Sequence, residues 1–509
     1  MHNGNFVHIY YTSKFCAQGD TMKKLLPVLL VLLICLFGMV GCNDYVAKTS
    51  ADCNTYTIVA GYDEQNHVLS AVQTVCFTNP YDLALDSVKL HVYGNCYGED
   101  CSAIVPQNCY DTAYYNGASY GGVTFDSVKV DDTSVAFVVE GESFDILSVP
   151  LSAPLNKGQS VTIELTYELT LANVAHRLGY GENTVNLGNF YPVLCHLDSN
   201  GFLCTPYYSV GDPFVTPVAN YDVTLTAPSN FVVASSGNLV SAEAHGDQTT
   251  YTYQAKAIRD FAMVLSTGFK HVSADADGVT INYYYFADQN PQNTLATAVG
   301  MTQFLSQKVS KYPYKQLTVA EADFCHGGME YGNLVMVASG GKDYLTATAH
   351  EVAHQWFYGV VGNNQIEHGW MDEGLSEFVT LLYMDKHQDQ PLATAIKKLY
   401  KNYVTYVDVL TNYYGRVDVS FRSLDKYKND TEYVYVTYVR GCLLFYTVYD
   451  NVGEAKFFNA LSRYFNQCKM TLATPQQMID SFCQACNKDV SGIFDAFISG
   501  KDIISEGNR

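Results

Sequence analysis

The chain has 509 residues, of which 48% are hydrophobic and 14% aromatic, and this is enough apolar material for two or three packed domains. Its 51 acidic residues outnumber its 30 basic ones, so the net charge at pH 7 is −21. A chain this acidic is not expected to attract nucleic acid or an anionic membrane surface, and no nucleic-acid partner is predicted.

The N-terminal segment predicts export from the cytoplasm. Residues 1–21 are expected to be an upstream extension of the natural start. Residues 22–41 have the form of a signal peptide, because a short basic start precedes the apolar run Leu25–Val40. The end of this run resembles a bacterial lipobox, which implies cleavage before Cys42 and acylation of that cysteine. We therefore expect a lipoprotein anchored through Cys42 to the extracellular face of a bacterial cell membrane, with plain secretion as the alternative.

Cysteine usage agrees with export. Of the 15 cysteines, Cys16 and Cys35 precede the expected cleavage site and Cys42 is the expected acylation site, which leaves 12. An even number in local groups outside the cytoplasm suggests disulfides. Cys483 and Cys486 have the spacing of a metal or redox motif, but no second pair matches them, so a structural role is favoured.

After a polar tether at residues 42–52, an N-terminal β domain is expected over residues 53–272. Segments such as SVKLHVYG and SVTIELTYELTL alternate apolar and polar residues and are separated by Gly, Asn, Pro and Asp. This pattern is typical of antiparallel strands joined by short turns. No nucleophile, phosphate loop or second metal site is expected in this half.

A mostly helical domain is expected over residues 273–509. Asn293–Lys311 has apolar residues at helical spacing, whereas Leu317–Asp323 and Leu334–Ser339 are strand-like and flank a glycine-rich turn. Two strands on either side of such a turn form a hairpin in most proteins.

The segment from His350 to Glu373 has the residues of a zinc hydrolase. Within the helix expected at Leu345–Val361, His350 and His354 lie on one face and can present two imidazole nitrogens to one ion. Glu351 lies about 100° round the helix, beside the metal, where a general base belongs. Glu373 follows the second histidine by 19 positions in a second helical pattern and is the candidate third ligand.

Beyond this segment, helices are expected at Pro391–Tyr406, Glu454–Cys468 and Thr474–Cys486, and a polar loop at Gly415–Asp430. Tyr433–Tyr449 is ambiguous. Its β-branched and aromatic content favours a strand, whereas the spacing of its apolar residues favours a helix.

Four motifs together resemble the aminopeptidase N family of gluzincin zinc metallopeptidases, which includes leukotriene-hydrolase-type enzymes. They are Gly328-Met329-Glu330, His350-Glu351 with His354, Trp370 through Glu373-Gly374, and Tyr438-x-Arg440-Gly441. Arg259-Asp260-Phe261-Ala262 also resembles the segment that leads into the family's catalytic domain. The resemblance implies an α+β fold, in which a saddle-like antiparallel β domain precedes a thermolysin-like, mostly α-helical catalytic domain. The large C-terminal helical domain of many members is not expected.

The resemblance also implies catalytic roles. His350, His354 and Glu373 would hold one Zn²⁺ per chain and leave a fourth position for water. Glu351 would take a proton from that water as general base. Tyr438 would stabilise the oxyanion that forms on the scissile carbonyl.

Glu330 determines the kind of peptidase that the resemblance implies. In the family this glutamate, in the Gly328-Met329-Glu330 motif, binds the free α-ammonium of a peptide substrate. An anionic anchor favours substrates with a free N-terminus, so an aminopeptidase is expected. Tyr331 stands where many members have Asn, which leaves the neighbouring subsite undefined.

Two other functions remain open. Glu330 argues against a thermolysin-like endopeptidase, and the intact motif argues against an inactive surface binding protein on a metallopeptidase fold.

Asp372 could orient a ligand histidine or be a solvated acid at a helix start, whereas His326 and His368 are expected not to be ligands. No residue could be matched to the glutamine that the family's β domain contributes.

Overall fold

The structure is a computed structural model that describes residues 50–101, 104–341, 343–415 and 417–501. The leader and Cys42 lie outside these residues, so export and acylation stay predictions. None of the helices within the described ranges is long and apolar enough to cross a membrane.

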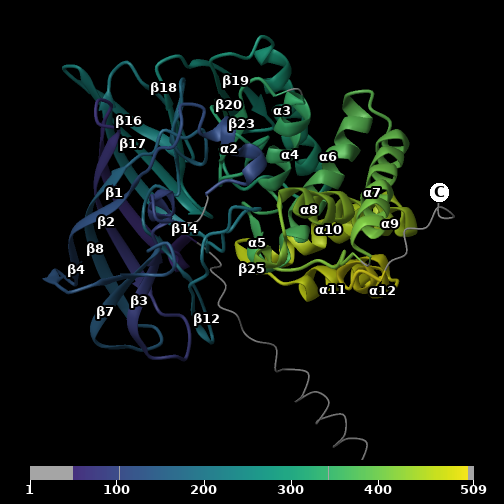
Figure 1. The fold of residues 1–509 in the computed structure, drawn as a ribbon, viewed down its shortest axis with the longest axis horizontal. Helices are drawn as coiled ribbons and strands as arrows, with labels where there is room; N and C mark the ends of the chain where they lie inside the picture. The colour runs from purple at the N-terminus through teal and green to yellow at the C-terminus, as the bar shows by residue number, and fades with distance from the viewer. Residues whose placement is uncertain (1–49, 102–103, 342, 416, 502–509) are drawn as a thin grey trace, which may run out of the picture. The chain divides into compact units, whose positions relative to one another are not determined.

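Strands dominate the first half of the described chain, as the alternating pattern predicts (Figure 1). The largest sheet has the order β16-β17-β14-β1-β2-β8-β4-β5, and its neighbours are antiparallel except for the parallel pair β1 and β14. Its strands are β1 Asn54–Asp63, β2 Val68–Thr78, β4 Gly122–Val130, β5 Thr133–Ser134, β8 Ser160–Thr170, β14 Ala219–Pro228, β16 Asn238–His245 and β17 Gln248–Ile258. In β8, Val161, Ile163 and Leu165 are buried while their neighbours are more exposed, so one face covers a core.

Two four-stranded sheets contribute to the same core. The first consists of β9 Leu178–Tyr180, β10 Val185–Gly188, β15 Val232–Ser235 and β18 Ala262–Ser266, and the second of β3 Leu85–His91, β6 Val138–Glu140, β7 Ile146–Leu155 and β11 Val193–Leu194. A short hairpin, β12 His196–Asp198 and β13 Gly201–Leu203, completes this half.

A five-stranded sheet begins the second half, in the order β19-β20-β21-β23-β22. Its strands are β19 Lys270–Ala276, β20 Val279–Tyr285, β21 Gln316–Ala322, β22 Gly328–Met329 and β23 Leu334–Ala338. The expected hairpin is wrong, because β21 and β23 are parallel and the short β22 pairs antiparallel with β23 at the sheet edge. Every residue of β21 and β23 is buried, which is typical of parallel strands covered on both faces.

Helices make up most of the remainder, and Figure 1 shows them in green and yellow beside this sheet. They are α3 Pro291–Lys308, α4 Tyr344–His354, α5 Gln365–His368, α6 Glu373–His387, α7 Leu392–Tyr414, α8 Asp430–Tyr433, α9 Arg440–Val452, α10 Glu454–Cys468, α11 Pro475–Cys486 and α12 Ser491–Ile498. The α+β class and the order of a β-rich part before a helical part are thereby confirmed.

The helix that carries the two histidines is shorter than the prediction Leu345–Val361. It ends at His354, and Val361–Asn363 forms strand β24, which pairs with β25 Thr471–Ala473. Pairing with a strand more than a hundred residues away is a tertiary contact that helical spacing cannot anticipate. The expected helix Pro391–Tyr406 is part of the longer α7.

The ambiguous segment Tyr433–Tyr449 is helical. Between α8 and α9 lies a π-helical turn, Val434–Val439, which carries Tyr438. π-Helical turns are rare and are frequent at functional sites.

Candidate active site

Helix α4 brings His350 and His354 to one buried face, where they meet Glu373, the first residue of α6. The Nε2 atoms of the two histidines are 3.0 Å apart, and Oε2 of Glu373 lies 3.2 Å from the first and 3.1 Å from the second. Bonds of about 2.0–2.1 Å to a tetrahedral zinc ion would separate such atoms by about 3.3 Å. The three side chains therefore fit a zinc ion.

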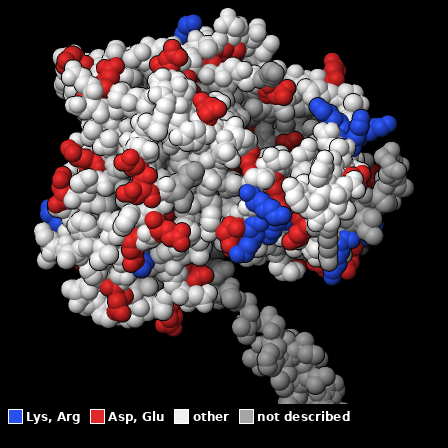
Figure 2. Space-filling model, in the orientation of Figure 1, with Lys and Arg blue, Asp and Glu red and all other residues white. Residues whose placement is uncertain are grey.

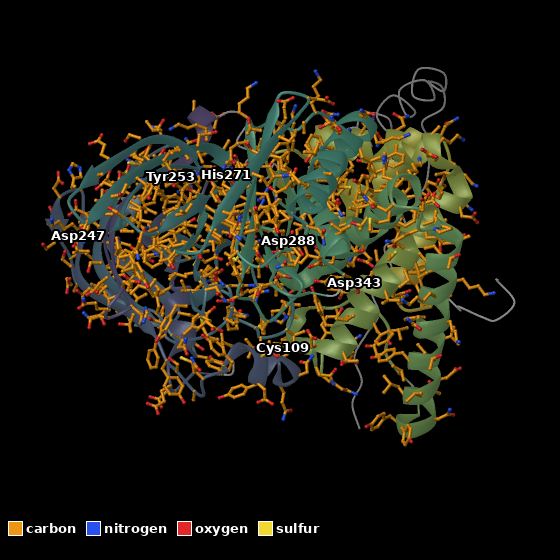
Figure 3. The ribbon with its side chains drawn as sticks, turned by 90° about the horizontal axis from the view of Figure 1, so that it is seen from above. Cys109, Asp247, Tyr253, His271, Asp288 and Asp343 are labelled. Atoms are coloured by element: carbon orange, nitrogen blue, oxygen red, sulfur yellow. The ribbon has the colours of Figure 1, made fainter. Side chains whose placement is uncertain are left out.

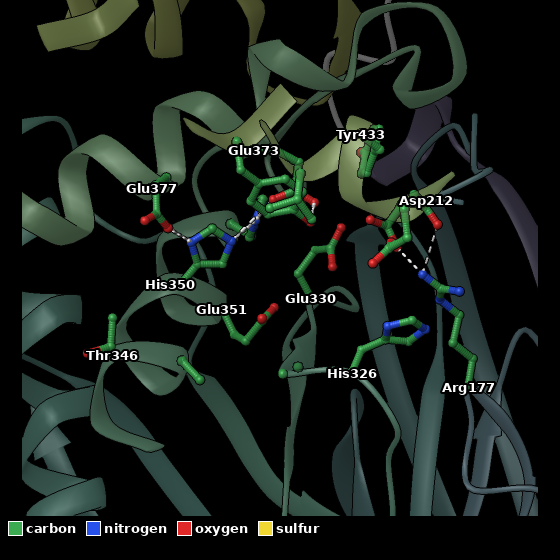
Figure 4. Close-up of a pocket in the computed structure, with 18 residues that line it drawn as sticks. Arg177, Asp212, His326, Glu330, Thr346, His350, Glu351, Glu373, Glu377 and Tyr433 are labelled. Carbon is green, nitrogen blue, oxygen red and sulfur yellow. Dashed lines mark hydrogen bonds and ion pairs between the residues drawn. The ribbon is translucent and has the colours of Figure 1, made fainter. Parts of the chain in front are cut away.

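The second nitrogen of each histidine has its own partner. Nδ1 of His354 lies 3.1 Å from the carbonyl oxygen of Phe357, and Nδ1 of His350 lies 3.2 Å from Oε2 of Glu377, one turn into α6 (Figure 4). Such partners hold the protonated nitrogen and leave Nε2 free for a metal.

Asp372 is the N-cap of α6. Its Oδ1 accepts a 2.9 Å hydrogen bond from the backbone N–H of Glu373, and its side chain is buried. It is therefore neither the solvated acid nor the histidine partner that the sequence suggested. Its effect on the site is to fix where α6 and Glu373 begin.

Glu351 faces the same pocket as the histidines (Figure 4). Burial raises the pKa of its carboxyl to about 7, although the two histidines oppose this shift. A Cβ atom on Gly328 would lie 2.4 Å from Oε1 of Glu351. Glycine at this position in β22 therefore makes the space that the carboxylate occupies.

Tyr438 approaches the site from the π-helical turn. Its hydroxyl donates a 2.6 Å hydrogen bond to Oε1 of Glu373, and its ring stacks on His350 with centroids 5.9 Å apart. Burial raises the pKa of this phenol well above its usual range, so it stays protonated and can donate.

Glu330 follows Met329, the last residue of β22, and lines the same pocket. Its Oε1 accepts a 2.9 Å hydrogen bond from Nε2 of Gln365. Burial is the main cause that raises the pKa of this carboxyl, and the charge of Asp212 adds to it.

Sequence reasoning missed two pocket residues from the β-rich half, Arg177 and Asp212. The guanidinium forms a buried ion pair with Asp212 and donates a 3.2 Å hydrogen bond to Sδ of Met329. Carboxylate oxygens of Asp212, Glu330 and Glu373 lie within 4.8 Å of one another. No local pattern marks Asp212, which lies in an irregular segment before β14.

Glu377 was also missed, although one signal was present. It follows Glu373 by four positions, so both carboxylates lie on the same face of α6. His368 does not line this pocket, whereas His326 does.

The pocket encloses about 310 Å³ and is strongly acidic. Its carboxylates come from Asp212, Glu330, Glu351, Glu373, Glu377 and Asp430, against the single cation Arg177. Acidic side chains also spread over the visible face of the molecule (Figure 2). Such a pocket suits a metal ion together with a positively charged ligand.

Part of the chain matches a known peptidase family, and curated aminopeptidases are similar to it. Residues 294–497 match the peptidase family M1 domain. Aminopeptidase M1-B of Oryza sativa subsp. japonica is 23% identical over 279 residues, which cover 49% of this chain and 30% of that protein. Aminopeptidase M1 of Arabidopsis thaliana is 27% identical over 187 residues, which cover 33% of this chain and 21% of that protein. The chain thus spans about a third or less of these two relatives.

Solved structures show the same fold over nearly the whole chain. The M1 zinc metallopeptidase from Deinococcus radiodurans superposes with a TM-score of 0.64 at 15% identity, covering 88% of this chain and 93% of that one. A mutant of that protein bound to a Tyr-Ser-Ala substrate gives a TM-score of 0.64, with 89% and 95% covered. The arrangement of a β-rich part before a helical part is thus shared with a two-domain metallopeptidase.

Proposed function

We propose that this protein, whose residues 294–497 match the peptidase family M1 domain, is a zinc-dependent aminopeptidase that removes N-terminal residues from peptides. The observation that carries the proposal is the position of Glu330. Its carboxylate lines the same small pocket as His350, His354 and Glu373. A free α-ammonium bound there would place the first peptide bond at the metal.

The electrostatics of the pocket support this assignment. Glu330 and Asp212 are both buried, and Arg177 is the only cationic side chain among the residues that line the pocket. Buried carboxylates without enough positive charge nearby are costly to ionise, so the cluster favours a ligand that carries its own cation. A substrate ammonium supplies that charge, whereas an acylated or internal nitrogen does not.

The catalytic roles follow from the contacts of each side chain. A zinc ion held by His350, His354 and Glu373 would activate a water molecule for attack and polarise the scissile carbonyl. Glu351, beside the triad, accepts the proton of the attacking water and delivers it to the leaving amine. Tyr438 turns its hydroxyl from Glu373 to the oxyanion that develops on the carbonyl oxygen.

The test compares chromogenic aminoacyl substrates with their N-acetylated forms, with and without a chelator. We expect release of amino acids from the free forms only, abolished by the chelator and restored by zinc. Glu330→Gln should raise KM for substrates with a free N-terminus. It should also reduce the difference in hydrolysis rate between the free and the N-acetylated substrates. Glu367→Gln, at an exposed acid that does not line the pocket, is the matched control and should change neither the KM nor this difference.

Other outcomes would assign the alternatives. Cleavage of N-acetylated peptides at internal bonds would make the protein an endopeptidase. Stoichiometric zinc without turnover of any peptide would make it a binding protein on a metallopeptidase fold.

A further inference from the structure

We propose that this protein binds a second zinc ion through Cys109, His176, Cys325 and His326. This ion is distinct from the one that His350, His354 and Glu373 would hold, and these three residues are called the catalytic triad below. Ligand atoms of His176, Cys325 and His326 lie within 4.8 Å of one another. Sγ of Cys109 lies 3.8 Å from Nδ1 of His326. The sequence had indicated no metal site in the β-rich half and no ligand role for His326.

The donor set and its spacing suit zinc. Two thiolates and two imidazoles form one of the common structural zinc sites, and tetrahedral bonds of ordinary length separate sulfur and nitrogen by about 3.6 Å. The 3.8 Å between Cys109 and His326 is close to this value. Cys109 and Cys325 are both free thiols, so both sulfurs are available as ligands.

His176 is already oriented as a metal ligand. Its Nδ1 lies 2.8 Å from the hydroxyl of Tyr97, which also accepts a hydrogen bond from the backbone N–H of Leu178. Its Nε2 lies 3.4 Å from Nη1 of Arg177, and a guanidinium can only donate, so Nε2 carries no proton. A metal-binding imidazole likewise has one nitrogen held by a polar partner and the other unprotonated, and a zinc ion at Nε2 would displace the guanidinium N–H that contacts it here.

The charge of Arg177 does not prevent binding. Its guanidinium is ion-paired with Asp212, and two thiolates neutralise the two charges of a zinc ion. The guanidinium would therefore face a neutral complex.

Backbone hydrogen bonds bring the ligand-bearing segments together without a metal. The N–H of Ala175 donates to the carbonyl of Ala113, 2.8 Å away, and the N–H of Cys325 donates to the carbonyl of Ala175, 3.0 Å away. Ala113 ends the short helix α2 (Tyr110–Ala113), which directly follows Cys109. Three distant segments therefore converge on the four side chains, and the site is pre-organised.

This second site borders the candidate active site. Figure 3 shows Cys109 on the segment of the β-rich half that faces the green helices, and Nδ2 of Asn108 lies 3.3 Å from Oδ2 of Asp430. Figure 4 shows His326 on the pocket wall near Arg177, and Gly327 and Gly328 continue that wall towards Glu330. A zinc ion here would join this wall to the β-rich half, so its loss should raise KM more than it lowers kcat.

Metal analysis tests the proposal on the full chain. We expect two zinc ions per chain in the wild type and one in Cys109→Ser and in His326→Asn. The second variant, at a half-buried residue, keeps the test valid if the first does not fold. Cys204→Ser is the matched control, because Cys204 is also a half-buried free cysteine but lies outside the cluster, and it should keep two ions.

Cobalt substitution separates the two sites without measuring activity. The catalytic triad has no sulfur, so thiolate-to-cobalt charge-transfer absorption reports on the second site alone. We expect this absorption in the wild type and its loss in Cys109→Ser. One zinc ion per chain in both the wild type and Cys109→Ser, with no such absorption in either, would overturn the proposal. A disulfide between Cys109 and Cys325 would also overturn it, and mass spectrometry would detect that disulfide as a wild-type mass lower by two hydrogen atoms. Neither result depends on whether the protein is an aminopeptidase.

Discussion

Tyr438 donates its hydrogen bond to Oε1 of Glu373, whereas Oε2 of the same carboxylate faces both histidines. One carboxylate thus places the phenol beside the metal position without using the oxygen that would bind the metal. Tyr438→Phe removes only this donor and should lower kcat by about 10²–10³. Zinc content and melting temperature should stay unchanged. Activity within a few-fold of wild type would remove Tyr438 from its role at the oxyanion.

Glu351→Gln should abolish most turnover and leave zinc binding intact. Glutamine fills the space above Gly328 as glutamate does but cannot accept the proton of the attacking water. General-base catalysis contributes about 10²–10⁴ in rate, so kcat should fall by that factor. Zinc per chain, measured alongside kcat, distinguishes a lost base from a lost metal. A variant that loses both would show that Glu351 supports the metal site instead.

Glu377→Gln should weaken zinc binding by about 10–100-fold, because the carboxylate next to Nδ1 of His350 orients that imidazole. Competition with a chromogenic chelator measures the affinity. At saturating zinc the variant should regain most of its activity, since Glu377 touches no substrate in the proposed mechanism. Glu367→Gln, at an exposed acid on α5, is the control and should bind zinc as the wild type does. Equal zinc affinities for the wild type, Glu377→Gln and Glu367→Gln would contradict the role of Glu377 in orienting His350.

The sequence was sufficient to identify the residues that local spacing brings together. His350 and His354 share a face because four positions make about one helical turn, and the expected helix Thr474–Cys486 is present as α11, with Thr474 as its N-cap. Residues brought in by tertiary contacts could not be found this way. Asp212 lies more than a hundred positions before Glu330, and no periodicity connects an irregular segment to a strand in another part of the fold.

The predictions of strand direction and of helix ends were wrong for the same reason. β21 and β23 were expected to form a hairpin, but direction depends on which neighbour each strand meets, and β20 and β22 were not visible as partners. Helix α4 ends early because Val361–Asn363 pairs with β25. Apolar spacing alone does not distinguish a buried helix end from a buried strand.

Gly441→Ala should destabilise the fold and disturb the site together. Helices α6 and α9 approach so closely that a Cβ atom on Gly441 would lie 2.8 Å from Cα of Gly374, the residue after Glu373. Overpacking of this kind costs about 1–3 kcal/mol, and moving α6 would displace Glu373 from Tyr438. The melting temperature, measured by thermal unfolding, and kcat should therefore both be lower in the variant. Gly492→Ala in α12 is the matched control, because nothing lies within 4 Å of its added Cβ, and an unchanged melting temperature is expected there.

His91 should make the fold sensitive to acid. It is 3% exposed at the end of β3, and burial lowers the pKa of its imidazole from 6.5 to about 4, although a backbone hydrogen bond to Leu203 opposes the shift. Between these pH values the unfolded chain binds a proton that the folded chain excludes, so stability falls as pH drops from 6.5 to 4, by about 3 kcal/mol in total. Urea unfolding at pH 7 and pH 4.5 measures this loss. The loss should shrink in His91→Gln but persist in His245→Gln, whose side chain is 66% exposed, and an equal loss in all three proteins would assign the acid sensitivity to other groups.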